Sequence, residues 1–311
     1  MILQVNHLKK NFGEIKAVDD ISFDIPSGQI IGLLGPNGAG KSTTISMIST
    51  LYKPSSGELL FEGKDIVKEP KWIRPHLGYV PQEIALYQTL SGYENLKYFG
   101  GLYGLVGVQL KNRIEEISEI IGIKDRLKDR IDQYSGGMKR RINIGVALLH
   151  KPKMIIMDEP TVGIDPQSRN HILDTVKLLN QQGMTVIYTS HYMEEVEAIC
   201  QNVHIMDHGK IIASGTQESL IEQSQSHASI HLKFDVDAHP YLDQLKQIKH
   251  VMAISETEDG GISLLAGGNG DAQKEIIRSV IGMDIGLVSF DVTKPNLEQV
   301  FLKLTGRGLR D

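Results

Sequence analysis

The segment that most constrains this chain is a glycine-rich loop between a short apolar run and a stretch with helical character. Residues 35–42 read Gly-Pro-Asn-Gly-Ala-Gly-Lys-Ser and match the pattern Gly-x-x-x-x-Gly-Lys-Ser/Thr. The glycines let backbone N–H groups turn inward, where most side chains would obstruct the turn. The apolar run Ile30–Leu34 and the helical stretch from Lys41 predict a strand, a loop and a helix. Such a helix points its positive N-terminus at bound phosphate.

This loop predicts a nucleotide site that also holds a metal ion. Lys41 is expected to reach the β- and γ-phosphates, and the Ser42 hydroxyl is expected to coordinate Mg²⁺. The alternative, a chance glycine turn, is disfavoured because a strand and a helix flank the motif as the chemistry requires. The predicted phosphate-binding residues are Gly35, Pro36, Asn37, Gly38, Ala39, Gly40, Lys41, Ser42 and Thr43.

A second motif ends another apolar run with two acids. Met154–Met157 is followed by Asp158 and Glu159. A carboxylate at such a strand tip can hold Mg²⁺ beside the phosphates, and we assign this role to Asp158. Glu159, one residue further on, is predicted to polarise an attacking water. Beside the glycine-rich loop, the pair predicts nucleotide hydrolysis; alone, it would be weak evidence.

Length and charge limit the other possibilities. The 311 residues suggest about two domains. A net charge of -5 argues against nucleic acid as the main partner, and the single Cys200 excludes an internal disulfide framework. The apolar runs are too short for a spanning helix, and the start Met1–His7 lacks the pattern of a signal peptide. We therefore expect a protein that stays inside the cell.

The strand pattern predicts an α/β first domain, at residues 1–220. Three runs are apolar on both faces, which is typical of buried parallel strands: Ile30–Leu34, Met154–Met157 and Thr185–Thr189. Three others alternate, as half-buried antiparallel strands do: Leu3–His7, Ile21–Ile25 and Glu58–Glu62. A polar run at Glu222–His227 is interpreted as a linker to a second domain, at residues 221–311.

The second domain is predicted to be a small α+β unit. Its expected elements are a strand at Ser229–Val236, a helix at Tyr241–Ile248, a hairpin turning at Asp259–Gly261, a helix at Ala272–Ile281, a strand near Leu287–Val292 and a helix at Leu297–Leu304. This order, βαββαβα, is similar to a split βαβ unit with an additional helix.

A third motif, Tyr134-Ser135-Gly136-Gly137-Met138, resembles the signature of ATP-binding cassette (ABC) ATPases, Leu-Ser-Gly-Gly-Gln. Tyr134 and Met138 depart from the commonest form, and Met138 lacks the amide. Ser135, Gly136 and Gly137 at a helix N-terminus still provide an anion-binding cradle. The resemblance covers residues 1–220. It implies a P-loop ABC nucleotide-binding domain with a mixed sheet, an antiparallel β subdomain and a helical subdomain.

The resemblance also implies roles for further residues. Gln82 corresponds to the Q-loop glutamine, which senses Mg²⁺ and the attacking water. His191 corresponds to the switch histidine at the γ-phosphate, and Gly163–Asp165 to the D-loop. Phe12 lies where the family stacks an aromatic ring on adenine. In this family Ser135, Gly136 and Gly137 close over ATP bound to a partner domain.

Each motif occurs once in the chain, so the resemblance implies a head-to-tail dimer of two copies around two ATP molecules. The final segment, Lys294–Arg307, resembles the ending of ABC-2-type exporter ATPases of the daunorubicin and linearmycin resistance group. This implies that the chain hydrolyses ATP at the cytoplasmic face of a membrane. Separate membrane-spanning permease subunits would then carry a drug-like compound outward.

Several alternatives stay open at this point. One is a soluble ABC ATPase that acts on DNA or ribosomes, although Lys41 and Asp158 are 158 − 41 = 117 residues apart with no sustained heptads between them. Another is an exporter of sodium, lipid or polysaccharide, and an importer subunit is a third. A P-loop GTPase would require an Asn-Lys-x-Asp motif, which the sequence lacks.

Three charged or histidine-containing segments are given structural interpretations. Lys139–Arg141 is expected to form a solvated helix face. Glu194, Glu195 and Glu197 lie early in a helix and would favour its dipole. His204 and His208 have a spacing that suits a metal only on a helix, but their segment is predicted to be a strand.

Overall fold

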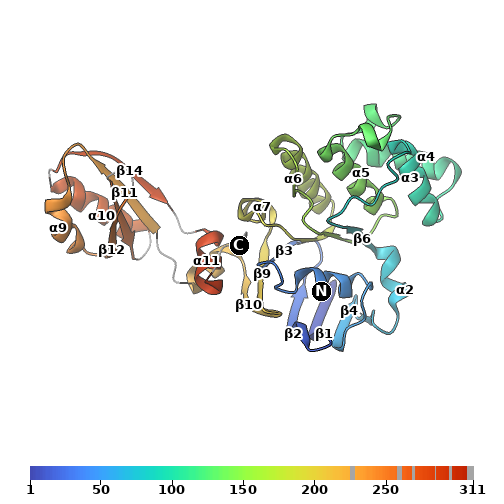
Figure 1. The fold of residues 1–311 in the computed structure, drawn as a ribbon, viewed down its shortest axis with the longest axis horizontal. Coiled ribbons are helices and arrows are strands. Elements are labelled where there is room, and N and C mark those ends of the chain that lie inside the picture. Colours follow the sequence, from blue (N-terminus) through green and yellow to red (C-terminus); the bar gives the residue numbers. More distant parts are fainter. Residues whose placement is uncertain (225–227, 258–260, 268–269, 284, 294–295, 307–311) are drawn as a thin grey trace. The chain divides into compact units, whose positions relative to one another are not determined.

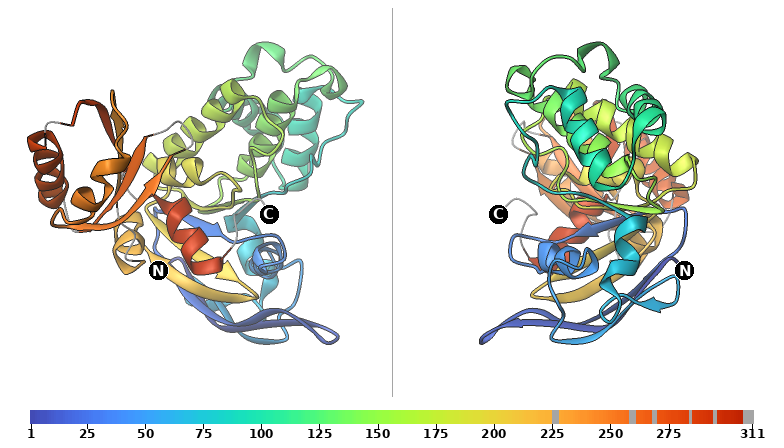
Figure 2. Two further views of the ribbon diagram at one scale, coloured as in Figure 1. Left: turned by 60° about the vertical axis from the view of Figure 1, so that its left-hand side comes forward. Right: turned by 90° about the vertical axis from the view of Figure 1, so that its right-hand side faces the viewer.

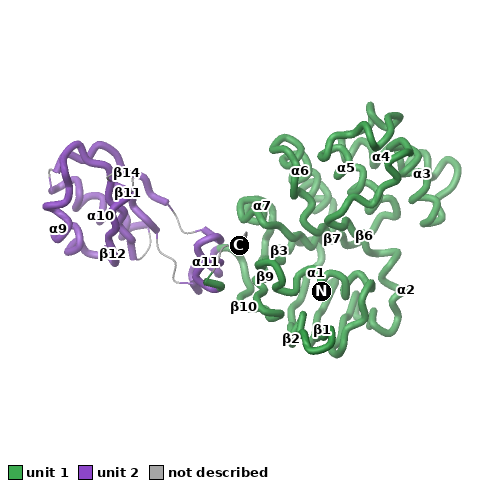
Figure 3. Tube along the Cα trace, viewed as in Figure 1, with its two compact units in different colours: residues 1–217, 305–311 green, residues 218–304 purple. Residues whose placement is uncertain are grey.

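A computed structural model describes residues 1–224, 228–257, 261–267, 270–283, 285–293 and 296–306 (Figure 1). Contacts divide the chain into unit 1, residues 1–217 and 305–311, and unit 2, residues 218–304 (Figure 3). The predicted boundary after residue 220 stays a prediction. Of the predicted linker, Glu222 and Gln223 lie in helix α8 (Gln217–Gln223), and residues 225–227 lie outside the described residues.

The large sheet of unit 1 is mixed, as predicted. Its described strands are β3 (Ile30–Leu34), β6 (Leu77–Val80), β7 (Met154–Met157), β8 (Thr185–Tyr188), β9 (Asn202–Asp207) and β10 (Lys210–Gly215). They lie in the order β10-β9-β3-β8-β7-β6, with β10 antiparallel to its neighbour and the others parallel. Every residue of β3, β7 and β8 is buried, because these strands have neighbours on both sides and apolar side chains on both faces.

The second sheet of unit 1 is antiparallel and contains the predicted alternating strands. Its described strands are β1 (Leu3–Phe12), β2 (Ile15–Ile25), β4 (Ser56–Phe61) and β5 (Lys64–Asp65), in the order β2-β1-β4-β5. Helix α1 (Lys41–Ile48) shares one apolar core with both sheets. That core includes Leu3, Ile45, Phe61 and Ile187. The core fixes the helix that follows the glycine-rich loop against the sheet that carries the acids.

Besides α1, the described α-helices that lie within unit 1 are α2 (Pro70–Ile73), α3 (Gly92–Leu102), α4 (Gly107–Ile120), α5 (Gly136–Leu148), α6 (Pro166–Gln181) and α7 (Met193–Ile199). Of these, α3, α4 and α5 pack together as the predicted helical part. Figure 2 shows α3–α5 at one end of unit 1 and the antiparallel sheet at the other. Ser91 and Glu94 form a capping box at the start of α3, so local sequence fixes where this helix begins.

Unit 2 has the predicted element order. Its described elements are β11 (Ala228–Phe234), α9 (Leu242–Lys246), β12 (Val251–Glu256), β13 (Ile262–Ala266), α10 (Gly270–Gly282), β14 (Leu287–Thr293) and α11 (Leu297–Thr305). The antiparallel order β12-β13-β11-β14 is that of a split βαβ unit. Alternate residues such as Ile230 and Leu264 pack in its core with Ile276. The predicted turn residues Asp259 and Gly260, and Lys294, Pro295 and Arg307 of the final segment, lie outside the described residues.

Within the described ranges, no helix has both the length and the apolar character that crossing a bilayer requires.

Candidate nucleotide-binding site

The candidate site lies at the carboxyl edge of the large sheet. Because β3, β6, β7 and β8 run parallel, the loops that follow them meet at this edge. A cavity of about 720 Å³ opens there. The predicted site residues that line it are Phe12, Asn37, Gly38, Ala39, Gly40, Lys41, Ser42, Thr43, Gln82, Glu159 and His191.

The glycine-rich loop is held tightly against neighbouring backbone. Gly40 has a φ of 104°, and a Cβ there would lie 2.5 Å from the Ala17 carbonyl oxygen. A Cβ on Gly35 would lie 2.4 Å from the Met206 carbonyl oxygen. Lys41 is buried, and its Nζ donates to the carbonyls of Gly35 at 2.6 Å and Pro36 at 3.2 Å. Burial lowers the pKa of Lys41, and the nearby acids oppose that shift.

The two acids after β7 are organised by a residue that the sequence analysis missed. Thr189 Oγ1 donates to Asp158 Oδ1 at 2.9 Å and accepts the Glu159 backbone N–H at 2.9 Å. Burial raises the pKa of Asp158, opposed by the Thr189 hydrogen bond and by Lys41. Thr189 could have been found as the polar residue that ends the apolar run of β8.

The predicted catalytic residues converge on Glu159. Gln82 Nε2 donates to Glu159 Oε2 at 2.9 Å, and His191 Nε2 lies 2.5 Å from Glu159 Oε1. Glu159 has a φ of 49°, a left-handed backbone that costs energy in a residue other than glycine. Both oxygens of the buried Glu159 carboxylate thus have a partner: Gln82, which follows β6, and His191, which follows β8.

Arg140 corrects the prediction of a solvated helix face at Lys139–Arg141. It is 4% exposed, and its guanidinium donates to the carbonyls of Pro81 at 2.7 Å and Gln82 at 2.6 Å. Burial lowers its pKa, opposed by Asp158. Arg140 shares the inward stripe of α5 with Ile144 and Ala147, four and seven residues on. It fastens the segment that carries Gln82 to the helical part.

Phe12 is available for stacking, because 45% of it is exposed where it lines the cavity. Its ring meets Tyr52 edge-on, with centroids 5.7 Å apart. Lys10 Nζ lies 5.0 Å from the same ring. An exposed aromatic ring that lines a cavity is of the kind that can stack on a base.

Ser135, Gly136 and Gly137 do not line the cavity that contains Lys41. Ser135 caps α5, and its Oγ accepts the Met138 N–H at 3.2 Å. A Cβ on Gly137 would lie 2.1 Å from Ser168 Oγ, so this glycine packs against the start of α6. Within the described residues, the phosphate loop and the Ser135 cradle are separate.

The predicted magnesium ligands fit that metal. Ser42 offers a hydroxyl in the cavity, and Asp158 offers a carboxylate at the same sheet edge. The Gln82 Nε2 donates to Glu159, so the side-chain carbonyl oxygen of Gln82 is the atom that could coordinate a metal ion. Mg²⁺ prefers oxygen ligands and commonly completes its shell with phosphates and water. Among the described residues no cluster of three or more His, Cys, Asp or Glu side chains offers an alternative metal site.

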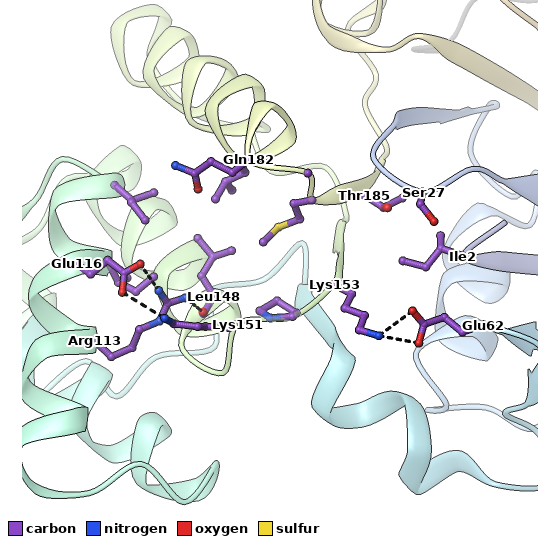
Figure 4. Close-up of a pocket in the computed structure, with 16 residues that line it drawn as sticks. Ile2, Ser27, Glu62, Arg113, Glu116, Leu148, Lys151, Lys153, Gln182 and Thr185 are labelled. Carbon is purple, nitrogen blue, oxygen red and sulfur yellow. Dashed lines mark hydrogen bonds and ion pairs between the residues drawn. The ribbon is translucent and has the colours of Figure 1, made fainter.

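A second cavity, of about 480 Å³, lies at the amino edge of the same sheet (Figure 4). Lys153 Nζ contacts both Glu62 carboxylate oxygens at 2.8 Å. Arg113 pairs with Glu116 at 2.7 Å and donates to the Leu149 carbonyl at 3.0 Å. These charges already have partners of opposite sign, so this cavity is not the candidate nucleotide site.

Comparison with known proteins agrees with this geometry. The family model "ABC transporter" matches residues 18–162. The chain is 48% identical over 311 residues to the Linearmycin resistance ATP-binding protein LnrL of Bacillus subtilis (strain 168), with 100% of both chains covered. It is 34% identical over 310 residues to the Doxorubicin resistance ATP-binding protein DrrA of Mycobacterium tuberculosis (strain ATCC 25618 / H37Rv), covering 98% of this chain and 94% of that one.

A solved ATP binding subunit of an ABC transporter superposes with a TM-score of 0.65 at 28% identity, covering 72% of this chain and 93% of that one. The fold and the site thus define a P-loop ATPase domain of the ABC type. The chain belongs to the ABC transporter family and to its drug-exporter group. It binds nucleotide and hydrolyses ATP, which confirms the predicted activity.

Proposed function

We propose that two copies of this chain pair head to tail around two Mg-ATP molecules at the cytoplasmic face of a membrane. Their closure and opening drive efflux of a drug-like compound through separate permease subunits. The drug-like cargo is inferred from the linearmycin and doxorubicin resistance names of the relatives. The observation that carries the proposal is the separation of the Ser135 cradle from its own chain's cavity. A second copy would bring the cradle of one chain to the ATP held by the other.

The residues at the carboxyl edge have complementary roles in this proposal. Lys41 and the loop N–H groups hold the β- and γ-phosphates, and Phe12 stacks on adenine. Water attacks the γ-phosphorus in line, its proton passes to the Glu159 carboxylate, and the bond to the β-phosphate oxygen breaks to release ADP. When bound, Mg²⁺ would be held by Ser42, Asp158 and Gln82 and would neutralise charge developing on the phosphates.

The contacts within the site suggest how ATP engages it. Gln82 and His191 both occupy the Glu159 carboxylate. A γ-phosphate would offer His191 Nε2 a competing acceptor, and a metal ion would attract the Gln82 carbonyl oxygen. Once His191 and Gln82 give up their contacts with Glu159 for these new partners, the Glu159 carboxylate would be free to bind water. The catalytic assignment is tested with Glu159→Gln, which is expected to bind ATP and fail to turn it over.

The permease is proposed to dock on the helical part beside the Gln82 segment. Exposed apolar side chains gather on α3 and on the loop that precedes α4, namely Tyr98, Leu102, Tyr103 and Val106, which are 44–70% exposed. Tyr87, from the segment after Gln82, packs edge-on against Tyr98 with centroids 5.0 Å apart. Such a surface suits an apolar helix of a partner.

The experiment that tests the transporter proposal is a gentle detergent pull-down of the tagged full chain from its native cells, read by mass spectrometry. Recovery of a protein with several membrane spans supports it. Leu102→Glu should lose that protein, whereas Met252→Glu, at another exposed apolar site, in unit 2, should retain it. Recovery of ribosomes or DNA-repair proteins without any membrane protein would contradict the proposal.

A further inference from the structure

Glu195 is a buried carboxylate outside the predicted site set. It lies in α7 and is 2% exposed. Its Oε2 accepts hydrogen bonds from Thr161 Oγ1 at 2.8 Å, Tyr188 OH at 2.9 Å and Ser190 Oγ at 2.6 Å. Burying an ionised carboxylate is costly unless hydrogen bonds and a nearby cation compensate it. An interaction with the helix dipole, the role predicted for Glu195, does not require these three hydrogen bonds. They indicate a further role for the carboxylate.

The hydroxyl donors come from the segments that present the catalytic side chains. Thr161 lies two residues after Glu159, on the loop that follows β7. Ser190 immediately precedes His191, and its Oγ also accepts the Tyr192 backbone N–H at 2.9 Å. The bonds to Glu195 thus fix both ends of the 2.5 Å contact between His191 and Glu159.

Arg169 provides the cation on the other side of the carboxylate. It lies in the first turn of α6, where its backbone N–H bonds to the Asp165 carbonyl at 2.9 Å. Its Nε is 3.4 Å from Glu195 Oε1, and its guanidinium lies over the Tyr192 ring at 4.3 Å. Arg169 therefore contacts the segment after His191 at two residues, Tyr192 and Glu195.

We infer that Glu195 is a positioning residue for ATP hydrolysis, which holds the loop of Glu159 and the loop of His191 in register through hydrogen bonds to Thr161 and Ser190. The inference rests on the proposed roles of Glu159 and His191. Glu195 does not line the nucleotide cavity, so it acts through these loops and not on the substrate. Its loss should lower the rate of the chemical step and leave ATP binding largely intact.

The test compares Glu195→Gln with Glu194→Gln in the full chain. Both remove one negative charge from the first turn of α7, but Glu194 is exposed. We expect Glu195→Gln to lower kcat for ATP hydrolysis at least about tenfold with KM changed less than about threefold. Glu194→Gln should keep both constants within about twofold of the unmodified chain. Equal kcat values for the two variants would overturn the inference.

A double-mutant cycle separates positioning from general destabilisation. If Glu195 acts through the switch loop, adding Glu195→Gln to His191→Ala should lower the residual kcat less than about twofold. A full additional tenfold loss would overturn the part of the inference that assigns the effect of Glu195 to the loop of His191. If His191→Ala alone hydrolyses ATP at the normal rate, the proposed role of His191 fails first and the inference fails with it.

Ser190→Ala covers the case in which Glu195→Gln does not fold. It deletes the hydroxyl nearest His191 and leaves the carboxylate with its other donors. We expect kcat to fall at least about threefold at unchanged KM, with a circular dichroism spectrum like that of the unmodified chain. A Ser190→Ala protein with unchanged kcat would overturn the inference.

Discussion

The two edges of the large sheet carry cavities of about 480 Å³ and about 720 Å³, and the basic side chains in these cavities have different partners. At the amino edge, Lys153 and Arg113 are paired with Glu62 and Glu116. At the carboxyl edge, Lys41 Nζ donates to carbonyls of its own loop, and the nearby charges of Glu159 and Asp158 favour its protonated form. A cation whose hydrogen bonds go to carbonyls can accept an anionic ligand at less cost than a cation that must first give up a bonded carboxylate.

The direction of the strands explains the difference. Parallel strands send all their carboxyl ends to one edge, where helices begin and their N–H groups face outward. α1 begins there, directly after the loop. The amino edge receives the ends of α5 and α6 instead, as the residues Leu148 and Gln182 in its cavity show. Substitutions that impair ATP hydrolysis should therefore lie at the carboxyl edge.

Glu159→Gln should produce the largest effect at that edge. The amide retains the shape but cannot take the proton from water, so hydrolysis should slow by about 10²- to 10⁴-fold. Fluorescent ATP binding should remain within about threefold, since the loop is untouched. Hydrolysis at the normal rate, measured by phosphate release, would remove Glu159 from the mechanism.

Lys41→Ala and Lys153→Ala compare one lysine from each edge. The first removes the cation at the phosphates and should lower kcat/KM about 10²-fold or more. The second breaks a surface ion pair worth at most about 1 kcal/mol and should leave kcat/KM within about twofold. Equal losses in the two variants would break the distinction between the edges.

His204, in β9 between the edges, should make unit 1 sensitive to acid. Burial lowers its pKa from 6.5 to about 4. The unfolded chain binds the proton first as the pH falls, so stability present above pH 6.5 is lost progressively down to about 4, by roughly 3 kcal/mol. His204→Gln should flatten this part of the stability–pH curve in urea denaturation. An unchanged curve would contradict the assignment to His204.

Arg140→Ala should have a smaller effect, at the carboxyl edge. It leaves the Pro81 and Gln82 carbonyls without their donor, which should cost about 1–3 kcal/mol in the free energy of unfolding. The exposed Arg130→Ala is the matched control and should cost less than about 1 kcal/mol. Denaturant unfolding measures both, and equal values would show that Arg140 does not fasten the Gln82 segment.

Local patterns predicted most of the architecture. Runs apolar on both faces gave β3, β7 and β8, because such strands are buried by neighbours wherever they lie. The phosphate loop and the Asp158–Glu159 pair could also be predicted, because each is a contiguous motif in the sequence. The split βαβ order of unit 2 followed from alternation and helix periodicity alone.

Long-range polar contacts could not be predicted in the same way. Thr189, Arg140 and Glu195 take their roles from partners on other strands and helices. A basic run on a helix is explained locally by a solvated face, and an acid in the first turn of a helix by the helix dipole. These local explanations gave no reason to expect the buried contacts of Arg140 and Glu195. Which face of α5 or α7 turns inward depends on the tertiary packing of those helices, and the local pattern favoured a solvent role for residues that the fold buries.

The central claim is that one chain holds only half of each ATP site. Light scattering after gel filtration of Glu159→Gln, with and without Mg-ATP, tests it most directly. We predict a mass of 34.5 kDa without nucleotide and twice that with it. Adding Ser135→Arg should prevent the doubling, because it blocks the cradle. A protein that binds Mg-ATP fully and still weighs 34.5 kDa would contradict the claim.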